Sequence, residues 1–237
     1  MNRQTGEPEH ALARRLGRLN VVTAVAFILG GGLFALGAAF AQLEVGTLVT
    51  VNTTYLVGGI FFSLGGYLSM LIAVNSTATD GSMRWWGYQP QRRDWSSAAV
   101  LFTGTLLFAV SLVAAFAQGL TPRQSNGWIW LPDILGCVCF LVSGHLAMLE
   151  VGNGHVRVRP RLLTWWVVAI NQLGSVLFFL AGVAAFTRPA TARALDIGLV
   201  NWGTFAGAVC FAVAGVVQVV DKPTAGTVAR PSGAHAT

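Results

Sequence analysis

Few side chains in this sequence could carry proton or metal chemistry, and His145 and Glu150 stand close together in the stretch GHLAMLE. A helix turns by about 100° per residue, so a separation of five residues places these side chains roughly 140° apart. They do not share a face, as the two histidines of a helical zinc motif do. His145 is a candidate proton carrier, because imidazole changes its charge near neutral pH. The sequence favours a simpler role, hydrogen bonding near the end of a membrane helix.

The cysteines and the isolated acid do not form a recognisable reactive site. Cys137 and Cys139 point to opposite sides of one helix, and Cys210 lies in another apolar segment, so we expect three packing residues. Asp133 follows Pro132, and proline with an acid in a first turn is an ordinary helix start. No phosphate loop, dinucleotide fingerprint or nucleophile elbow is present. The sequence therefore predicts no catalytic residue, no metal site, no cofactor and no enzymatic activity.

A few polar residues lie within apolar segments, on the side where we place the cytoplasm. An ionisable or polar residue inside a membrane span is a functional candidate by default. If helix packing brings these residues together, they form a small polar pocket that opens to the cytoplasm. The candidate binding residues are His145, Tyr67, Asn171, Gln172 and Gln218.

Membrane helices must position these side chains, because 54% of the chain is hydrophobic and only 10% is charged. That composition cannot cover a water-soluble surface. Most of the uncharged runs are long enough for a hydrocarbon core, which requires about 20 helical residues. We predict an all-α integral membrane protein with a transmembrane domain over 20–220, between a segment at 1–19 and a tail at 221–237. The predicted helices lie near 20–42, 54–75, 96–118, 128–150, 163–186 and 198–220.

The basic residues predict the orientation, because lysine and arginine are retained on the cytoplasmic side during insertion. One side carries twelve of the fifteen, against Arg123, Arg188 and Arg193 on the other. Both termini should therefore be cytoplasmic. Usage of fourteen arginines and one lysine is typical of a GC-rich bacterial genome, which indicates the bacterial inner membrane. The net charge of +6 needs no nucleic acid to explain it, since anionic headgroups favour these positions.

A repeated pattern divides the helices into three tandem hairpins, over 20–75, 96–150 and 163–220. The first helix of each hairpin places glycine four residues before phenylalanine, in GGGLF (30–34), GTLLF (104–108) and GSVLF (174–178). The second helices align Gly58, Phe62 and Gly66 with equivalent residues at 136, 140 and 144 and at 207, 211 and 215. Positions i, i+4 and i+8 form one stripe, which we interpret as packing surface.

Hairpins built on this Gly-x-x-x-Phe pattern, with Gly-Ser before the aromatic residue as in LGSVLFFLAG (173–182), resemble the YrhK-like domain of bacteria and archaea. The resemblance is best for the third hairpin and covers the helices without the tails or loops. It implies a hairpin architecture and supplies no catalytic or binding residue.

These features favour a non-catalytic bundle, with the lipid bilayer and a second copy or another membrane protein as partners. The alternative is a carrier or channel for a small solute or proton, which the repeat and the six helices favour. The lack of buried charge pairs and of intramembrane prolines speaks against transport. Residues 1–11 and 222–237 are rich in small and polar residues and should be mobile.

Overall fold

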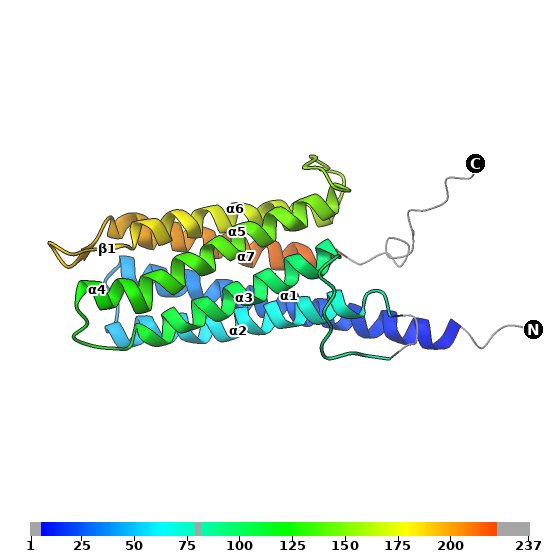
Figure 1. The fold of residues 1–237 in the computed structure, drawn as a ribbon, viewed down its shortest axis with the longest axis horizontal. Coiled ribbons are helices and arrows are strands. Elements are labelled where there is room, and N and C mark those ends of the chain that lie inside the picture. The colour runs from blue at the N-terminus through cyan, green and yellow to red at the C-terminus, as the bar shows by residue number, and fades with distance from the viewer. Residues whose placement is uncertain (1–5, 79–81, 222–237) are drawn as a thin grey trace, which may run out of the picture.

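The computed structural model describes residues 6–78 and 82–221, which form a bundle of long helices lying side by side (Figure 1). Among these residues, six helical spans are long and apolar enough to cross a membrane. The predicted fold class is confirmed, and the protein is an all-α membrane protein that places its apolar helices in a lipid bilayer. The helices are α1 (Gly6–Gln42), α2 (Leu48–Asn75), α3 (Arg93–Ala114), α5 (Leu131–Val151), α6 (Leu163–Ala184) and α7 (Ile197–Val220).

The six helices close into a ring. Each packs against its neighbours along the chain, and α7 packs against α1. Helix α1 begins, and α7 ends, at the same end of the bundle (Figure 1). We call this the basic end, because the loops there contain Arg84, Arg92 and the run 157–161. The opposite end, the β-hairpin end, carries α4 (Pro122–Ser125) and the antiparallel strands β1 (Thr187–Arg188) and β2 (Arg193–Ala194).

Several predicted boundaries differ from the structure by more than a turn, most of them at the starts of spans. Helix α1 begins at Gly6, well before the predicted residue 20, so residues 6–11 are helical and the prediction of mobility is wrong for them. The segment HALARRLGRL is rich in strong helix formers, and its charges end the apolar span without ending the helix. Helix α2 begins at Leu48 because Thr47 and Thr50 form a reciprocal capping box. The predictions for 1–5 and 222–237 lie outside the described residues.

The fourth span is longer than predicted and contains a π-helical turn. It runs without a break from Pro122 to Val151, through α4, η1 (Asn126–Trp130) and α5. The Leu131 N–H donates to the Asn126 carbonyl, five residues back. This wider turn directly precedes Pro132, which lacks an N–H and crowds the preceding helical turn. Asp133 stands in the first turn of α5, as predicted, but the span that contains α5 already begins at Pro122, so Pro132 lies within a span.

Glycine and phenylalanine interlock within each hairpin. A Cβ on Gly30 would lie 2.8 Å from Phe62 Cδ2, and a Cβ on Gly58 would lie 3.2 Å from Phe34 Cδ2. The glycine of each helix thus leaves room for the phenylalanine of the other, which lets the two backbones approach closely. The same reciprocal contacts join Gly104 to Phe140, Gly136 to Phe108, Gly174 to Phe211 and Gly207 to Phe178.

The last glycine of each stripe packs between hairpins. A Cβ on Gly66 would contact the Phe102 backbone of α3 at 3.3 Å, and one on Gly215 would lie 3.0 Å from the Ala24 carbonyl of α1. Gly144 lies directly beneath the Gln172 side chain of α6. The predicted packing role of these three glycines is confirmed. The stripes hold the ring together both within and between hairpins.

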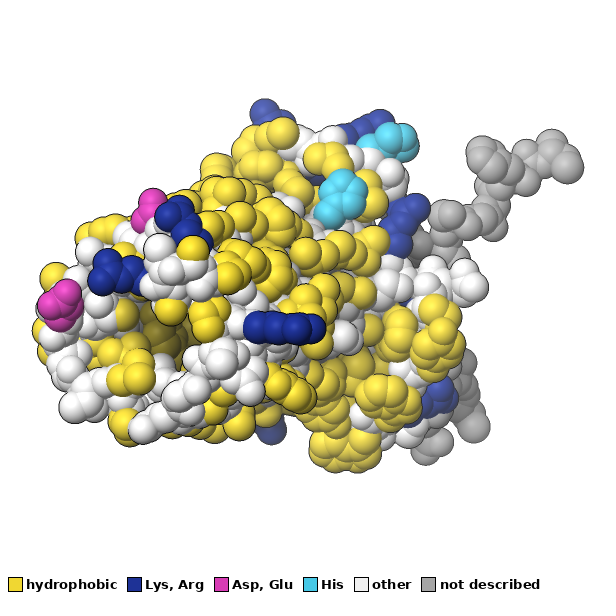
Figure 2. Space-filling view, turned by 60° about the vertical axis from the view of Figure 1, so that its left-hand side comes forward, with side chains coloured by type: hydrophobic (Ala, Val, Ile, Leu, Met, Phe, Trp, Pro, Cys, Tyr) yellow, Lys and Arg dark blue, Asp and Glu magenta, His cyan; other side chains and the backbone are white. Residues whose placement is uncertain are grey.

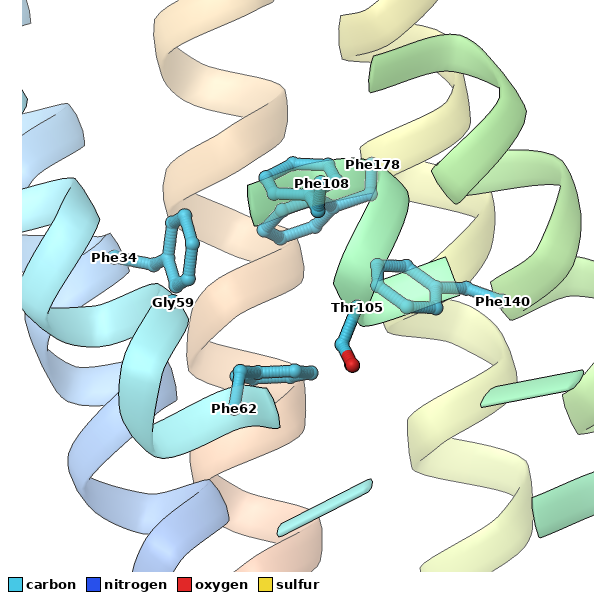
Figure 3. Close-up of a pocket in the computed structure, with 7 residues that line it drawn as sticks. All are labelled: Phe34, Gly59, Phe62, Thr105, Phe108, Phe140 and Phe178. Atoms are coloured by element: carbon cyan, nitrogen blue, oxygen red, sulfur yellow. The ribbon is translucent and has the colours of Figure 1, made fainter. Parts of the chain in front are cut away.

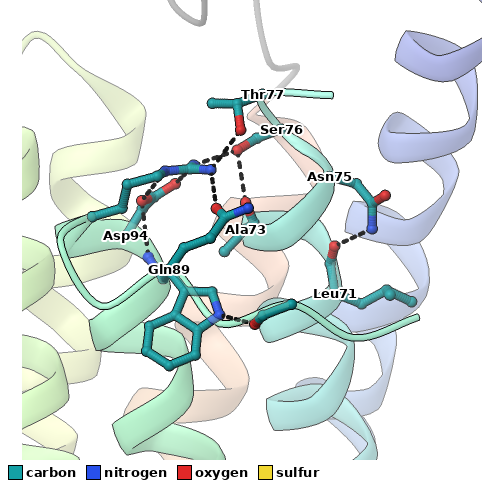
Figure 4. A network of polar contacts seen from close by, with 10 residues as sticks. Leu71, Ala73, Asn75, Ser76, Thr77, Gln89 and Asp94 are labelled. Carbon is teal, nitrogen blue, oxygen red and sulfur yellow. Dashed lines mark hydrogen bonds and ion pairs between the residues drawn. The ribbon is translucent and has the colours of Figure 1, made fainter. Parts of the chain in front are cut away.

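At the basic end, Arg92 ties the loop before α3 to the end of α2. Its guanidinium donates to Ser76 Oγ at 2.6 Å, Thr77 Oγ1 at 2.8 Å and Gln89 Oε1 at 2.6 Å, and it pairs with Asp94. Figure 4 shows this network beside the helix ends. The loop is therefore held against the bundle by charge-assisted hydrogen bonds.

Asn75, at the end of α2, anchors the same loop from inside. Its side chain is fully buried, and its amide donates to the carbonyls of Leu71 at 2.8 Å and Arg84 at 2.7 Å. Its carbonyl oxygen accepts the Arg84 N–H at 2.7 Å. The buried amide is thereby satisfied, as a polar group in an apolar surrounding must be.

Candidate functional site

Six phenylalanines, one from each long helix, fill the centre of the ring in two layers. The first helices of the hairpins contribute Phe34, Phe108 and Phe178, whose ring centroids lie 5.7–6.0 Å apart. The second helices contribute a triangle with centroids 5.1–6.2 Å apart, formed by Phe62, Phe140 and Phe211. Figure 3 shows five of these rings converging between the helices. The two layers seal the axis of the ring.

A cavity of about 230 Å³ lies against the first of these layers. Phe34, Phe108 and Phe178 belong to its lining, while the residues of the second layer do not. Its mouth is at the β-hairpin end, where Ser125 and Thr187 line it. Figure 2 shows the hollow at this end, with hydrophobic side chains at its bottom and a rim of hydrophobic and other groups. The ring is therefore open on one side of the phenylalanines, as far as their first layer.

Three positions of the cavity wall are equivalent along the chain. Tyr55, Asp133 and Thr204 each stand seven residues before the phenylalanine of a second helix, and all three line the cavity. Seven residues are two helical turns, so these side chains share a face with the phenylalanines. The second hairpin thus supplies a carboxyl group where the other hairpins supply hydroxyl groups.

Asp133 has no hydrogen-bond or ion-pair partner within residues 6–78 and 82–221. Its side chain is partly buried on α5, beside Gly182 of α6, where an added Cβ would lie 3.1 Å from Asp133 Oδ2. Trp130 stands three residues earlier, and its indole N–H donates to the Gly182 carbonyl at 2.9 Å. The glycine therefore makes room for the carboxyl group and fixes the neighbouring indole.

Several other polar groups in or beside the wall are engaged in structure. The Asn52 amide donates to the Ala115 carbonyl at 2.8 Å, which joins α2 to the end of α3. Asn126 and Thr187 exchange two hydrogen bonds of 2.8 and 2.9 Å, which hold β1 against η1 at the cavity mouth. The Cys137 thiol faces the Phe178 carbonyl at 3.5 Å. Asp133 is thus the acid left available to a bound molecule.

The sequence-predicted site residues lie elsewhere in the ring. The Tyr67 hydroxyl donates to the Trp85 carbonyl at 3.2 Å, at the contact of α2 with the loop before α3. Gln218 of α7 donates to Asn20 Oδ1 of α1 at 2.8 Å. Tyr67, Gln172 and Gln218 therefore lie at three different contacts between hairpins, and no hydrogen bond among the described residues joins them.

The α6 residues of the predicted group are Asn171 and Gln172, and the Gln172 side chain lies against α5. Ser175 Oγ donates to the Asn171 carbonyl at 3.0 Å. Gln172 Oε1 is buried over Gly144 without a hydrogen-bond partner. This unpaired oxygen lies in a tight helix contact, and Gln172 does not line the cavity.

His145 and Glu150 are both exposed on α5. His145 follows Phe140 by five residues, and Phe140 points to the axis of the ring, so the imidazole points outward. The described part of the chain holds no group of three or more His, Cys, Asp or Glu residues arranged for a metal ion.

Sequence reasoning missed the residues around the cavity, although one signal was available. The Gly-x-x-x-Phe stripe marks the axis-facing side of every helix, so residues seven before Phe62, Phe140 and Phe211 should also face the axis. That extension identifies Tyr55, Asp133 and Thr204 directly. Comparison with known proteins found no matching family model, no matching curated protein and no matching solved structure.

Replacing His145 with tyrosine, which stands at the aligned position 67, should leave the protein unchanged. The side chain is exposed on the outside of the ring, so the free energy of unfolding should change by less than about 0.5 kcal/mol. Thermal unfolding in detergent measures the stability, and proton flux in reconstituted vesicles measures whether any transport activity is unchanged. A proton flux that is present in the wild type and lost in His145→Tyr would contradict this assignment.

Proposed function

We propose that this protein is a carrier for a small solute, which binds in the cavity at the β-hairpin end. The position of the cavity is the observation that carries the proposal. It lies inside the ring and ends on the phenylalanine layers, rather than on the outer surface between two helices. A solute held there lies inside the ring, with the phenylalanine layers between it and the basic end.

The phenylalanine layers that close the ring consist of side chains, which can move. This favours a carrier over a permanently closed bundle. Phenylalanine rings rotate about two side-chain bonds, so their layers can part without unfolding a helix. The π-helical turn before Pro132 supplies a local site for bending in the span that carries Asp133. Binding on one side and release on the other require such a rearrangement.

The other hypothesis from the sequence is a non-catalytic bundle that associates with a second copy or another membrane protein. The cavity and its unpaired acid lead us to prefer the carrier, because a bundle that serves only for packing has no use for either. The equivalent contacts of the three hairpins support their origin as copies of one unit. Kinship with the YrhK-like domain is a further hypothesis that the shared hairpin pattern supports.

We propose that the basic end faces the cytoplasm of a bacterial inner membrane and that the cavity opens to the outside. The arginines of the 76–95 and 151–162 loops support this orientation. A reporter that is active only in the cytoplasm should therefore be active when fused after Val220. If a reporter that is active only outside the cytoplasm were active at the same position, the proposed orientation would be wrong.

The carrier is tested in two steps. A thermal-unfolding screen of the purified protein against small amines, carboxylates, sugars and amino acids should find a solute that raises the melting temperature. Vesicles that contain the protein should then take up this solute, in labelled form, faster than empty vesicles. Ser111→Trp, which fills the cavity wall on α3, should abolish uptake while the ring stays folded. A solute that binds without being taken up would show a receptor and contradict transport.

A further inference from the structure

We infer that the solute is a small organic cation, such as a short-chain primary amine, whose ammonium group pairs with the Asp133 carboxylate. This inference rests on the proposed function, since it concerns the same cavity. It specifies the charge, size and character of the molecule. Each of these follows from a different property of the wall.

Charge is the first property. The residues that line the cavity include one carboxyl group and no lysine, arginine or histidine. A carboxylate in an apolar surrounding is costly unless a positive charge or several hydrogen-bond donors stabilise it. Among the described residues Asp133 has neither. A bound cation supplies the missing charge, whereas an anion would meet repulsion.

The aromatic wall favours an organic cation over a metal ion. Five rings line the cavity, from Phe34, Tyr55, Phe108, Trp130 and Phe178. Aromatic faces attract ammonium groups by cation–π interaction, and they also accept an alkyl chain. Calcium takes six to eight oxygen ligands, and magnesium requires an octahedral shell. A single carboxylate among aromatic rings does not provide either shell.

The position of Trp130 brings the two kinds of contact together. It lies three residues before Asp133, so the indole and the carboxylate project from neighbouring positions of the same helix. The hydrogen bond from Trp130 to the Gly182 carbonyl holds the indole in place before any ligand binds. An ammonium group at Asp133 therefore meets an aromatic surface that is already oriented.

Size is the remaining property. A cavity of about 230 Å³ is smaller than the roughly 300–1,000 Å³ of pockets for drug-sized ligands. The floor is closed by Phe34, Phe108 and Phe178, so the alkyl chain of an amine would lie on these rings. A molecule of a few carbon atoms with one ammonium group fits this space, and a long or doubly charged molecule does not.

The first test compares butylammonium with butanoate and 1-pentanol, which match its size and differ in charge. Butylammonium should raise the melting temperature of the wild type in detergent, and the other two should not. Asp133→Asn keeps the shape of the side chain. This variant should need a butylammonium concentration about tenfold higher or more for the same rise in melting temperature. Glu150→Gln removes an exposed acid at the basic end and should respond like the wild type. An equal response of Asp133→Asn would overturn the inference.

A second measurement leaves Asp133 in place, in case its replacement prevents folding. In a variant without Cys137, Cys139 and Cys210, Ser111→Cys places one thiol on the cavity wall. A trimethylammonium-ethyl thiosulfonate should modify this thiol about tenfold faster than the sulfonate-ethyl analogue, after correction for their rates with a free thiol. Butylammonium should slow the reaction. Equal corrected rates, or faster reaction of the anionic reagent, would overturn the inference.

The outcomes separate this inference from the proposed function. Binding and uptake of a neutral or anionic solute would overturn the inference of a cationic solute and leave the proposed carrier function intact. Charge-selective binding of butylammonium without its uptake by vesicles would support the cation site and overturn the carrier. Loss of uptake in Asp133→Asn, with unchanged uptake in Glu150→Gln, would support both.

Discussion

Gly207→Leu should destabilise the protein by about 3 kcal/mol, because the new side chain has no space between α6 and α7. A Cβ at this position of α7 would lie 2.4 Å from Phe178 Cδ2 and 2.9 Å from the Gly174 carbonyl oxygen. Phe178 belongs to the first phenylalanine layer, and the Gly174 backbone cannot move without shifting α6. A leucine side chain therefore forces the two helices apart. Thermal or denaturant unfolding in detergent measures the loss.

Gly32→Leu is the matched control, because nothing lies within 4 Å of a Cβ added to Gly32. This glycine is also in the middle of a spanning helix, but it is exposed on the outside of the ring. Its replacement should leave the melting temperature close to that of the wild type. Similar losses from both variants would mean that the effect comes from adding leucine to a helix and not from the close contact.

The sequence was sufficient for the helices and for much of their packing. Long uncharged runs predict spans because the hydrocarbon core selects against charge. The Gly-x-x-x-Phe spacing predicts close helix contacts because small residues let backbones approach. The reciprocal contact between Gly30 and Phe62 could not be predicted in detail, because the glycine and phenylalanine spacing marks a packing face without identifying the helix that packs on it. Closure of the ring between α1 and α7 depends on the whole assembly.

The candidate site was harder to predict, for a physical reason that Asp133 illustrates. Proline followed by an acid usually marks a helix start, and here a π-helical turn lets the helix continue through Pro132. The acid therefore lies in the wall of a cavity and not at the start of the span. Tyr67 and Gln218 show the converse. They are polar residues inside spans, and each is satisfied by one local hydrogen bond at a different helix contact.

Phe211→Ala tests how much the packing of the phenylalanine layers stabilises the protein. The Phe211 ring lies 5.1 Å from Phe62 and 5.4 Å from Phe178, measured between centroids, so its loss opens a hole between the two layers. Lipid, and not water, surrounds the unfolded helices, so most of the free energy gained by moving an apolar side chain out of water is absent. The cavity term of roughly 24 cal/mol per Å³ remains, and we expect a loss of about 2–3 kcal/mol.

Phe116→Ala removes the same side chain two residues after the end of α3, where Phe116 is 38% exposed, and should cost much less. A double variant, Phe178→Ala with Phe211→Ala, should lose less than the sum of the single losses. The two rings contact each other, and such pairs contribute about 0.5–1.5 kcal/mol beyond their separate burial. Strict additivity would mean that the rings of the two layers are not coupled. In that case the barrier would consist of independent side chains, and a solute would pass them one at a time.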